Sequence, residues 1–520
     1  MAMGGLALPA GGRAVPRCDR RSDDLLVHVL PTVSHDRMLL KVSLREPQAA
    51  PPELRVGRRA FPGQRTDTGG THWMFDARGL APATRYTLEL RAGGCRLAEP
   101  WELATFPAPD ACPERFRVLV YTCAGGHDLL NELGPGFYLS WSARRRLFAR
   151  ALAFAPDAAV AIGDHVYWDL RVGFGSQVMA RHPVAIERIG VLDRSLPVLG
   201  SANEAVLKRA VGPQIAELYG TLFRSVPTFF LRDDHDYFED DLVTPELTTF
   251  PPDAFAVELA RASQWLYYPE FLPDPWRPLD LPASSASDRP RGVSEAFGTL
   301  RYGQLVELLL YDCKGFVSTG PDARYVPASV ESWLGARMAD PCLRHVVHVP
   351  SNPIGYTAGK YMEWYPDVVE TPGEVTDRVP KPGWQPGWRV QHDRLLAAIA
   401  GMPRRVPLVV SGDIHSIAEE RIVRAGAIDL RANPVVSVIS ATPATGVGWP
   451  SLARNTLAQP PTGFEVETVV PVQEVNGFHL LDFESDRVTI RHFRWDRRWQ
   501  SEDEIDRLEP FHLSEYRRPG

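Results

Sequence analysis

From Phe116 onward, short apolar runs of strand length alternate with stretches whose apolar positions recur at helical spacing. The apolar runs begin the segments 116–126, 158–169, 228–241, 305–315, 344–353 and 407–416, with further strand patterns at 435–444, 477–485 and 487–496. The helical patterns cover 142–156 and 390–403. Continuous apolar strands that alternate with helices are typical of sheets buried on both faces, so the pattern predicts an α/β fold. Functional loops are then expected at the carboxyl ends of the strands.

Residues 24–107 have a different pattern. Strand-like runs at 25–33, 38–46, 71–80 and 85–93 are separated by turn residues. The segment 77–93 resembles the loop-and-tyrosine corner of immunoglobulin- or fibronectin-type sandwiches. Prolines at 107, 109 and 113 mark a linker. We therefore predict a disordered tail (1–23), an all-β sandwich (24–107) and a catalytic domain (108–520).

Composition narrows the choice of partners. The 520 residues carry a formal net charge of −7 and are 44% hydrophobic, which supports a large core without a basic surface. Nucleic acid is therefore not expected as a partner. Because no apolar run approaches the roughly 18 residues that span a bilayer, a membrane is not expected either. The six cysteines are scattered without a CxxC pair, and the N-terminus lacks an apolar export segment, so we expect a cytoplasmic protein with reduced thiols.

Three predicted strands end in an acidic pair or in Gly-Asp, followed by a histidine. The residues are Asp164, His165 and Tyr167; Asp233, Asp234, His235 and Asp236; and Asp413 and His415. Cys123 follows a fourth strand. Each of these has an ordinary interpretation, since Gly-Asp forms turns and a lone histidine or cysteine is usually structural. Their recurrence at successive strand ends favours a site for a pair of metal ions, because buried carboxylates require a compensating cation.

The motifs resemble the metallophosphoesterase (calcineurin-like) superfamily, and within it the alkaline phosphatase D (PhoD-like) family. The superfamily pattern runs DxH, GDxx(D/Y), GNH(E/D), a lone histidine and GHxH. Here the second motif is Gly163-Asp164-His165-Val166-Tyr167, the third is Asp233-Asp234-His235-Asp236 and the fifth is Gly412-Asp413-Ile414-His415. Cys123 stands where the first motif has its aspartate, as in the PhoD-like branch.

This resemblance implies a four-layer α/β/β/α sandwich preceded by the β-sandwich, and a dinuclear metal centre that activates water for in-line attack on phosphorus. Fe(III) would be held by Cys123, Asp164, Tyr167 and His415. Calcium, or another divalent cation, would be held by Asp164 as the bridge with Asp234 and Asp413. A cysteine nucleophile is the alternative role for Cys123. Many relatives are exported proteins.

Two residues are candidates for contacts with the substrate. His235 would stabilise the phosphoryl charge or protonate the leaving group. Lys314 stands in Asp312-Cys313-Lys314, where relatives often carry Asp-x-Arg, and is either a phosphate contact or a surface lysine. His345 and His348 are candidates for the lone-histidine ligand. The acidic run 239–241, where relatives often place an asparagine, would supply ligands or repel anionic substrates.

The expected function is hydrolysis of a small-molecule phosphoester, as a phosphomonoesterase, a phosphodiesterase or both. One alternative is a PhoD-like metalloenzyme recruited to a different hydrolytic or specialised-metabolism reaction at the same site. Another is a catalytically inactive binding protein, which would have no physical need for the whole ligand set. The motifs select neither the substrate nor the oligomeric state.

Overall fold

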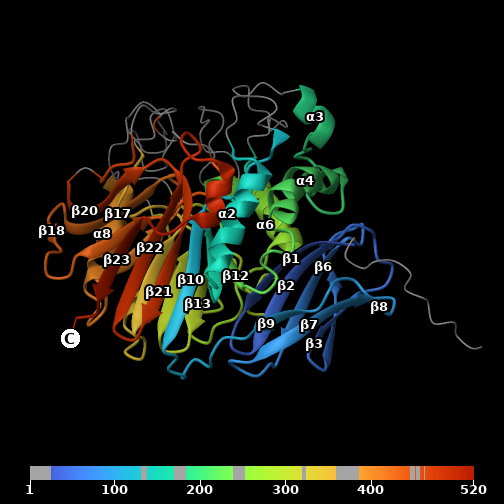
Figure 1. Ribbon diagram of the computed structural model, residues 1–520, viewed down its shortest axis with the longest axis horizontal. Coiled ribbons are helices and arrows are strands. Elements are labelled where there is room, and N and C mark those ends of the chain that lie inside the picture. The colour runs from blue at the N-terminus through green and yellow to red at the C-terminus, as the bar shows by residue number, and fades with distance from the viewer. Residues whose placement is uncertain are drawn as a thin grey trace, which may run out of the picture.

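The computed structural model describes residues 25–129, 138–168, 183–237, 252–318, 324–358, 386–445, 451, 457–461 and 463–519. Within them, two large mixed sheets form the centre of the molecule (Figure 1). The first has the order β12 (Thr228–Leu231), β11 (Ala158–Ile162), β10 (Arg115–Thr122), β21 (Asn476–Glu484), β22 (Arg487–Trp495) and β23 (His512–Arg517). Strands β10, β11 and β12 are parallel, and β21 runs antiparallel to β10.

The second sheet has the order β13 (Phe297–Tyr302), β14 (Val306–Tyr311), β15 (His345–Pro350), β16 (Leu408–Ser411), β19 (Val435–Ile439), β17 (Ile417–Ala425) and β18 (Ile428–Asp429). Strand β20 (Phe464–Gln473) also pairs with β17. The four strands β14, β15, β16 and β19 are parallel. Each apolar run that the sequence predicted as a strand in this part of the chain is a strand here.

Alternating side chains of each strand enter different layers. Val118 and Val120 of β10 lie in a cluster with Leu308 and Leu310 of β14, between the two sheets. Leu119 of β10 instead packs in a cluster with residues of the helices on the outer face. Since strand residues alternate between faces, apolar residues at both parities require both faces to be covered.

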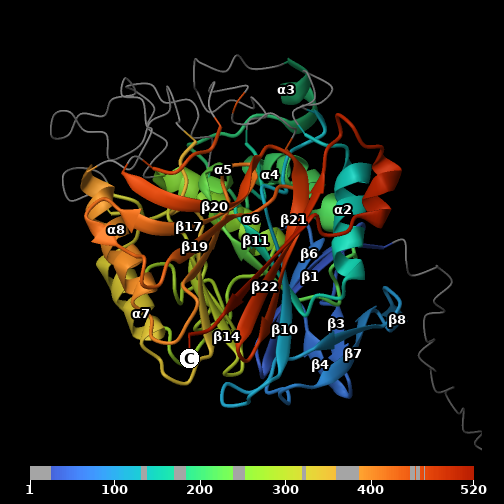
Figure 2. The ribbon, with the colours of Figure 1, turned by 60° about the vertical axis from the view of Figure 1, so that its left-hand side comes forward.

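Helices cover both outer faces of the paired sheets (Figure 2). On one side lie α2 (Trp141–Ala153), α4 (Ala202–Gly212) and α6 (Ala254–Tyr267), and on the other α7 (Ala328–Met338) and α8 (Pro386–Ala400). The predicted helices at 142–156 and 390–403 correspond to α2 and α8. Ser140 caps α2 by accepting a hydrogen bond from Ala143 N, and Asp253 caps α6 in the same way through Ala256 N. The shorter helical segments are α3 (Pro183–Ile189), η2 (Pro213–Glu217), α5 (Asp234–Tyr237) and η3 (Glu502–Arg507).

The N-terminal strands form two antiparallel sheets. One contains β1 (Leu26–Val33), β2 (Arg37–Leu44), β6 (His72–Arg78) and β5 (Gln64–Arg65). The other contains β4 (Arg59–Pro62), β3 (Glu53–Val56), β7 (Arg85–Ala92), β8 (Cys95–Arg96) and β9 (Trp101–Ala104). The Tyr86 hydroxyl accepts a hydrogen bond from Ala81 N, as in a tyrosine corner. The immunoglobulin-like assignment and the boundary at 107 stay predictions, and the tail 1–23 lies outside the described residues.

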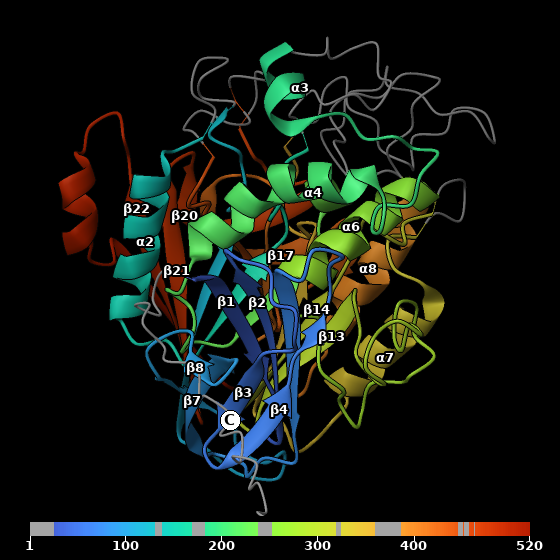
Figure 3. The ribbon, with the colours of Figure 1, turned by 90° about the vertical axis from the view of Figure 1, so that its right-hand side faces the viewer.

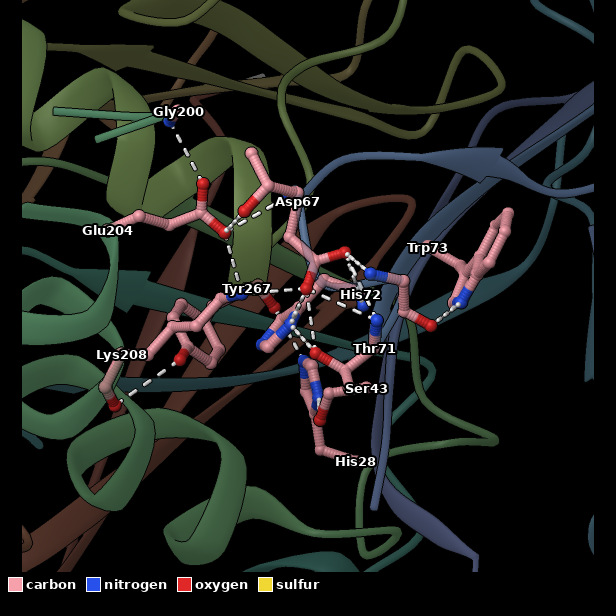
Figure 4. A network of polar contacts seen from close by, with 12 residues as sticks. His28, Ser43, Asp67, Thr71, His72, Trp73, Gly200, Glu204, Lys208 and Tyr267 are labelled. Carbon is pink, nitrogen blue, oxygen red and sulfur yellow. Dashed lines mark hydrogen bonds and ion pairs between the residues drawn. The ribbon is translucent and has the colours of Figure 1, made fainter. Parts of the chain in front are cut away.

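A buried polar cluster joins the N-terminal sheets to the helical layer, where β1 and β2 lie beneath α4 and α6 (Figure 3). We call it the Asp67 cluster, and its members are His28, Ser43, Asp67, Thr71, His72, Glu204, Lys208 and Tyr267 (Figure 4). Lys208 Nζ of α4 lies 2.7 Å from Asp67 Oδ2 and 2.8 Å from Glu204 Oε1. His28 Nε2 of β1 donates to the Tyr267 carbonyl at the end of α6.

Among the described residues, the helices are all too short or too polar to cross a bilayer.

Candidate metal centre

The carboxyl ends of four strands meet at one place. Cys123 follows β10, Asp164 follows β11 and Asp234 follows β12, and these three strands are parallel neighbours. Asp413 follows β16 of the other sheet. The two sheets approach closely at Gly412, where a Cβ atom would lie 2.3 Å from Thr122 Oγ1, so only glycine fits between them.

The loops after these strands have an unusual backbone. Cys123, Asp164, Asp413 and His415 have φ values of 52°, 54°, 73° and 41°. Residues other than glycine rarely occupy this left-handed region, and those that do cluster at functional sites. The strand-end loops therefore turn sharply and direct their side chains to a common point.

Cys123, Asp164, Tyr167 and His415 form a first group. The Cys123 thiol donates to Asp164 Oδ2 at 3.2 Å, and the Tyr167 hydroxyl donates to the same oxygen at 2.9 Å. The Tyr167 hydroxyl also lies 2.9 Å from His415 Nε2. Ligand atoms of Cys123, Asp164 and His415 all lie within 4.8 Å of one another. The structure thus brings together the four residues expected to hold the ferric ion.

A second group shares Asp164 with the first. Carboxylate oxygens of Asp164, Asp233 and Asp234 lie within 4.8 Å of one another, and the three side chains are buried. The sequence predicted Asp234 and Asp413 in this group and missed Asp233. The third motif contains Asp233 directly before Asp234. In a straight strand, adjacent side chains point to opposite faces, so only one of the two was expected to face the metal.

Asp413 lies nearby, although it is not in either group of close ligand atoms within the described ranges. Its carboxylate contributes to the raised pKa of Cys123 and of Asp164, after the larger effects of burial and closer carboxylates. Asp413 N also donates to Thr122 Oγ1. Asp413 is therefore at the rim of the same cluster.

The electrostatics of the cluster call for a cation. Burial, followed by the neighbouring Asp234 carboxylate, holds the pKa of Asp164 and of Asp233 well above their usual range. Burial, followed by the Asp164 carboxylate, raises the pKa of the Cys123 thiol and the Tyr167 phenol. Anionic forms of these groups are unfavourable side by side unless positive charge is added.

The hydrogen bonding of these acids supports the same requirement. Within the described part of the chain, Asp164 Oδ1 and both carboxylate oxygens of Asp233 are buried and have no hydrogen-bond partner. Buried polar atoms are nearly always paired, and oxygen-rich clusters suit hard cations. The donor set of thiol, phenol, imidazole and carboxylates fits a pair of metal ions that share Asp164.

His235 and Lys314 border the two groups. The His235 ring lies 4.4 Å from the Tyr167 ring, measured between centroids. Lys314 Nζ lies 3.7 Å from Asp234 Oδ2, and Lys314 is only 5% exposed. Its turn is held by Asp312 Oδ1, which accepts hydrogen bonds from the backbone N–H groups of Lys314 and Gly315. The interpretation of Lys314 as a surface lysine is therefore wrong.

The other histidine candidates face elsewhere. His345 Nε2 donates to the Glu484 carbonyl at 2.6 Å, and His348 Nδ1 lies 3.3 Å from the Tyr311 hydroxyl. Burial lowers the pKa of His345 to about 4 and that of His348 to about 3. His165 Nε2 donates to the Leu231 carbonyl. Each of the three makes a contact away from the two ligand groups and none belongs to either group, and the acidic run 239–241 lies outside the described residues.

Two further residues brace the strand-end loops, and no motif indicated them. Gln214, in the π-helical turn η2, accepts hydrogen bonds from Gly126 N at 2.7 Å and from Tyr167 N at 2.8 Å. Arg144 of α2 is fully buried and donates to the Gly126 carbonyl at 2.6 Å. Gln214 thus ties the loop after Cys123 to the loop that carries Tyr167, and Arg144 holds the loop after Cys123 against α2.

Known structures share this fold. The chain is similar to the structure of PhoD, with a TM-score of 0.60 and 12% sequence identity over 96% of this chain and 92% of that one. It is also similar to a purple acid phosphatase from seeds of yellow lupin (Lupinus luteus), with a TM-score of 0.54 and 11% identity over 95% of this chain and 74% of that one. The resemblance to PhoD that the motifs indicated is thereby confirmed for the fold. No family model matches the sequence, and no curated protein matches it.

Proposed function

We propose that the protein is a metal-dependent phosphoester hydrolase with a dinuclear centre. The observation that carries this proposal is that Asp164 belongs to two buried groups of ligand atoms at once. A carboxylate in this position can bridge two cations. The similarity of the fold to PhoD and to a purple acid phosphatase supports the same proposal.

Each group has a preferred ion. Cys123, Asp164, Tyr167 and His415 would hold Fe(III), because thiolate and phenolate are strong anionic donors. The carboxylates of Asp164, Asp233 and Asp234, with Asp413 beside them, would hold Ca²⁺ or another divalent cation that prefers oxygen. When bound, the two cations would supply Lewis-acid activation of water and charge neutralisation for in-line displacement at phosphorus.

Two residues of the chain would act on the substrate. His235, placed against Tyr167, would stabilise the phosphoryl charge or give a proton to the leaving oxygen. Lys314 would contact a phosphate oxygen as a point charge from the side of Asp234. Because Asp164, Asp234 and Lys314 are buried, electrostatic interactions with these groups are strong.

The finer assignments belong to the same proposal. The substrate would be a small phosphomonoester or phosphodiester, and nucleic acid and membrane would not be partners. Residues 24–107 would form an immunoglobulin- or fibronectin-like sandwich in front of a catalytic domain at 108–520.

The test is to measure metals and activity in the same preparation. We expect iron in the purified protein, a visible charge-transfer band, and hydrolysis of p-nitrophenyl phosphate or its bis ester that increases with added calcium. Tyr167→Phe should shift or abolish the band. A colourless but active enzyme would refute the ferric assignment alone, whereas metal-loaded protein inactive on every phosphoester would refute the function.

One observation favours a second candidate, a different hydrolytic reaction at the same centre. Lys314 already faces the Asp234 carboxylate at 3.7 Å, which would weaken its hold on a phosphate. A panel of phosphorylated metabolites and of carboxylic esters distinguishes the two. Release of phosphate supports the first proposal, and ester cleavage without phosphate release supports the second.

A further inference from the structure

We propose that Asp236 is a positioning residue that fixes the Asp164 carboxylate, which both ligand groups of the metal centre share, relative to Asp233 of the second group. The proposal rests on the proposed function for its catalytic consequence, but not for its structural one. Asp236 is the last residue of the Asp-Asp-His-Asp motif and had been given no role. It is 1% exposed.

The carboxylate of Asp236 accepts four backbone hydrogen bonds. Its Oδ2 accepts from Asp164 N at 2.8 Å and from Asp233 N at 3.0 Å. Its Oδ1 accepts from His165 N at 2.8 Å and from Val166 N at 3.0 Å. Hydrogen bonds to an ionised acceptor are short and strong, so both oxygens are fully used within the protein. Asp236 is therefore not available as a metal ligand.

These four contacts join the two motifs that supply the metal ligands. Asp164, His165 and Val166 belong to the loop after β11, whereas Asp233 belongs to the loop after β12. A single oxygen, Asp236 Oδ2, contacts the backbone of both loops. The distance between the Asp164 and Asp233 carboxylates consequently depends on where this side chain sits.

The backbone at Asp164 needs such support. Its φ of 54° lies in the left-handed region, which residues other than glycine occupy only when the surroundings enforce it. The negative charge of Asp236 gathers three consecutive N–H groups, from residues 164 to 166, around one carboxylate. This arrangement favours the sharp turn that directs Asp164 between the two groups and brings Tyr167 beside it.

The test compares Asp236→Asn with Asp67→Asn in the full chain. An asparagine amide keeps one acceptor oxygen but points an NH₂ group at N–H donors, so half of the contacts are lost. Asp67 is a matched control, because it too is a buried aspartate that accepts backbone hydrogen bonds, from Gly70 N and His72 N, but it lies in the Asp67 cluster. Both substitutions should lower stability.

Only Asp236→Asn should affect the centre. We expect amide exchange of residues 164–166 to accelerate by about 10-fold or more, affinity for Mn²⁺ after chelator stripping to fall by about 10- to 100-fold, and kcat on p-nitrophenyl phosphate to fall by about 100-fold with a smaller change in KM. Asp67→Asn should leave these values as in the wild type. If Asp236→Asn matches Asp67→Asn in Mn²⁺ affinity, the positioning role is refuted.

A second variant and the two measurements that do not depend on activity cover the cases in which Asp236→Asn does not fold or the wild type is inactive. If Asp236→Asn does not fold, Asp236→Glu carries the test, because it retains both acceptor oxygens but displaces them by one methylene. Its Mn²⁺ affinity should fall below that of Asp67→Asn, and an unchanged affinity would overturn the proposal. If the wild type hydrolyses no phosphoester, the proposed function fails, while amide exchange and Mn²⁺ affinity still decide the role of Asp236.

Discussion

In two buried polar regions of this molecule, the surroundings shift the pKa of aspartate side chains in opposite directions. In the Asp67 cluster, the Asp67 carboxylate accepts from three backbone N–H groups and lies against Lys208 Nζ. Burial opposes the ionised form, but the hydrogen bonds from His72 and Lys208 outweigh it and hold the pKa of Asp67 far below its usual range. In the metal centre, burial and neighbouring carboxylates raise the pKa of Asp164 and Asp233 instead.

The difference separates a structural acid from a ligand. The Asp67 charge is compensated by donors that the chain itself supplies, so it stabilises the fold and needs nothing from solution. Asp233 has two buried oxygens without a hydrogen-bond partner in the described structure, and its pKa is raised by burial and by Asp234 despite the opposing charge of Lys314, so its ionised form calls for an added cation. Burial and acidity alone do not distinguish the two sites, whereas the source of the compensating charge does.

The largest effect should come from removing the shared carboxylate. Asp164→Asn should lower phosphoesterase activity by about 1,000-fold or more, because both cations lose a ligand. With chelator present, the same variant should be more stable than wild type by about 1 kcal/mol, since one charge is removed from a cluster of buried acids. Steady-state kinetics and urea unfolding with chelator measure the two effects.

The control is Asp67→Asn, measured in the same way. It should lose stability equally with and without chelator, because no metal is involved. If Asp164→Asn lost stability in chelator and bound metal normally, Asp164 would be a structural acid like Asp67. The contrast drawn between the Asp67 cluster and the metal centre would then be wrong.

A smaller effect is expected in the Asp67 cluster itself. Asp67→Asn should lower the free energy of unfolding by about 2 kcal/mol, because an amide cannot satisfy the same N–H donors or compensate Lys208. The activity of the folded variant should equal that of the wild type. Urea denaturation and kinetics test both statements, and a large loss of kcat in folded protein would show that the cluster is coupled to the centre.

The smallest effect concerns pH. Burial lowers the pKa of His28 to about 3, so the folded protein keeps this ring neutral. As pH falls below 6.5, the ordinary pKa of histidine, His28 binds a proton in the unfolded chain but stays neutral in the folded chain. Stability should therefore fall between pH 6.5 and pH 5, by about 1–2 kcal/mol from this residue.

His28→Gln should reduce this slope, because glutamine can still donate to the Tyr267 carbonyl but does not titrate. The matched control is His35→Gln at a half-buried position in the turn after β1. Thermal unfolding in chelator at pH 6.5 and pH 5 keeps the metal centre out of the comparison. Equal slopes for wild type and His28→Gln would contradict the neutral assignment.

The sequence indicated the positions of the strands and the polar residues that gather at their ends. Apolar runs at both parities require sheets covered on both faces, and an α/β fold brings the carboxyl ends of parallel strands together. Polar residues immediately after such strands are therefore expected to meet, and Cys123, Asp164, Asp234 and His415 do fall in the two close groups that share Asp164. Local spacing was sufficient because each ligand lies within a few residues of its own strand.

Other features depend on contacts between distant segments. Whether Asp233 or Asp413 completes the second group depends on how the chain turns after β12, and that turn is held by four hydrogen bonds to Asp236. Lys314 is buried where the loop after β14 meets the loop after β12. Gln214 braces Tyr167 from a helical turn 47 residues away in the sequence.

The sequence by itself determined which residues end the strands, because apolar periodicity and the residues that follow it are local properties. Only the tertiary structure decided which of the buried acids are compensated by the protein. Asp67 is paired with Lys208 across 141 residues, while Asp164 and Asp233 face other carboxylates. The charge state of a buried group depends on everything that surrounds it in space, and no local pattern records those neighbours.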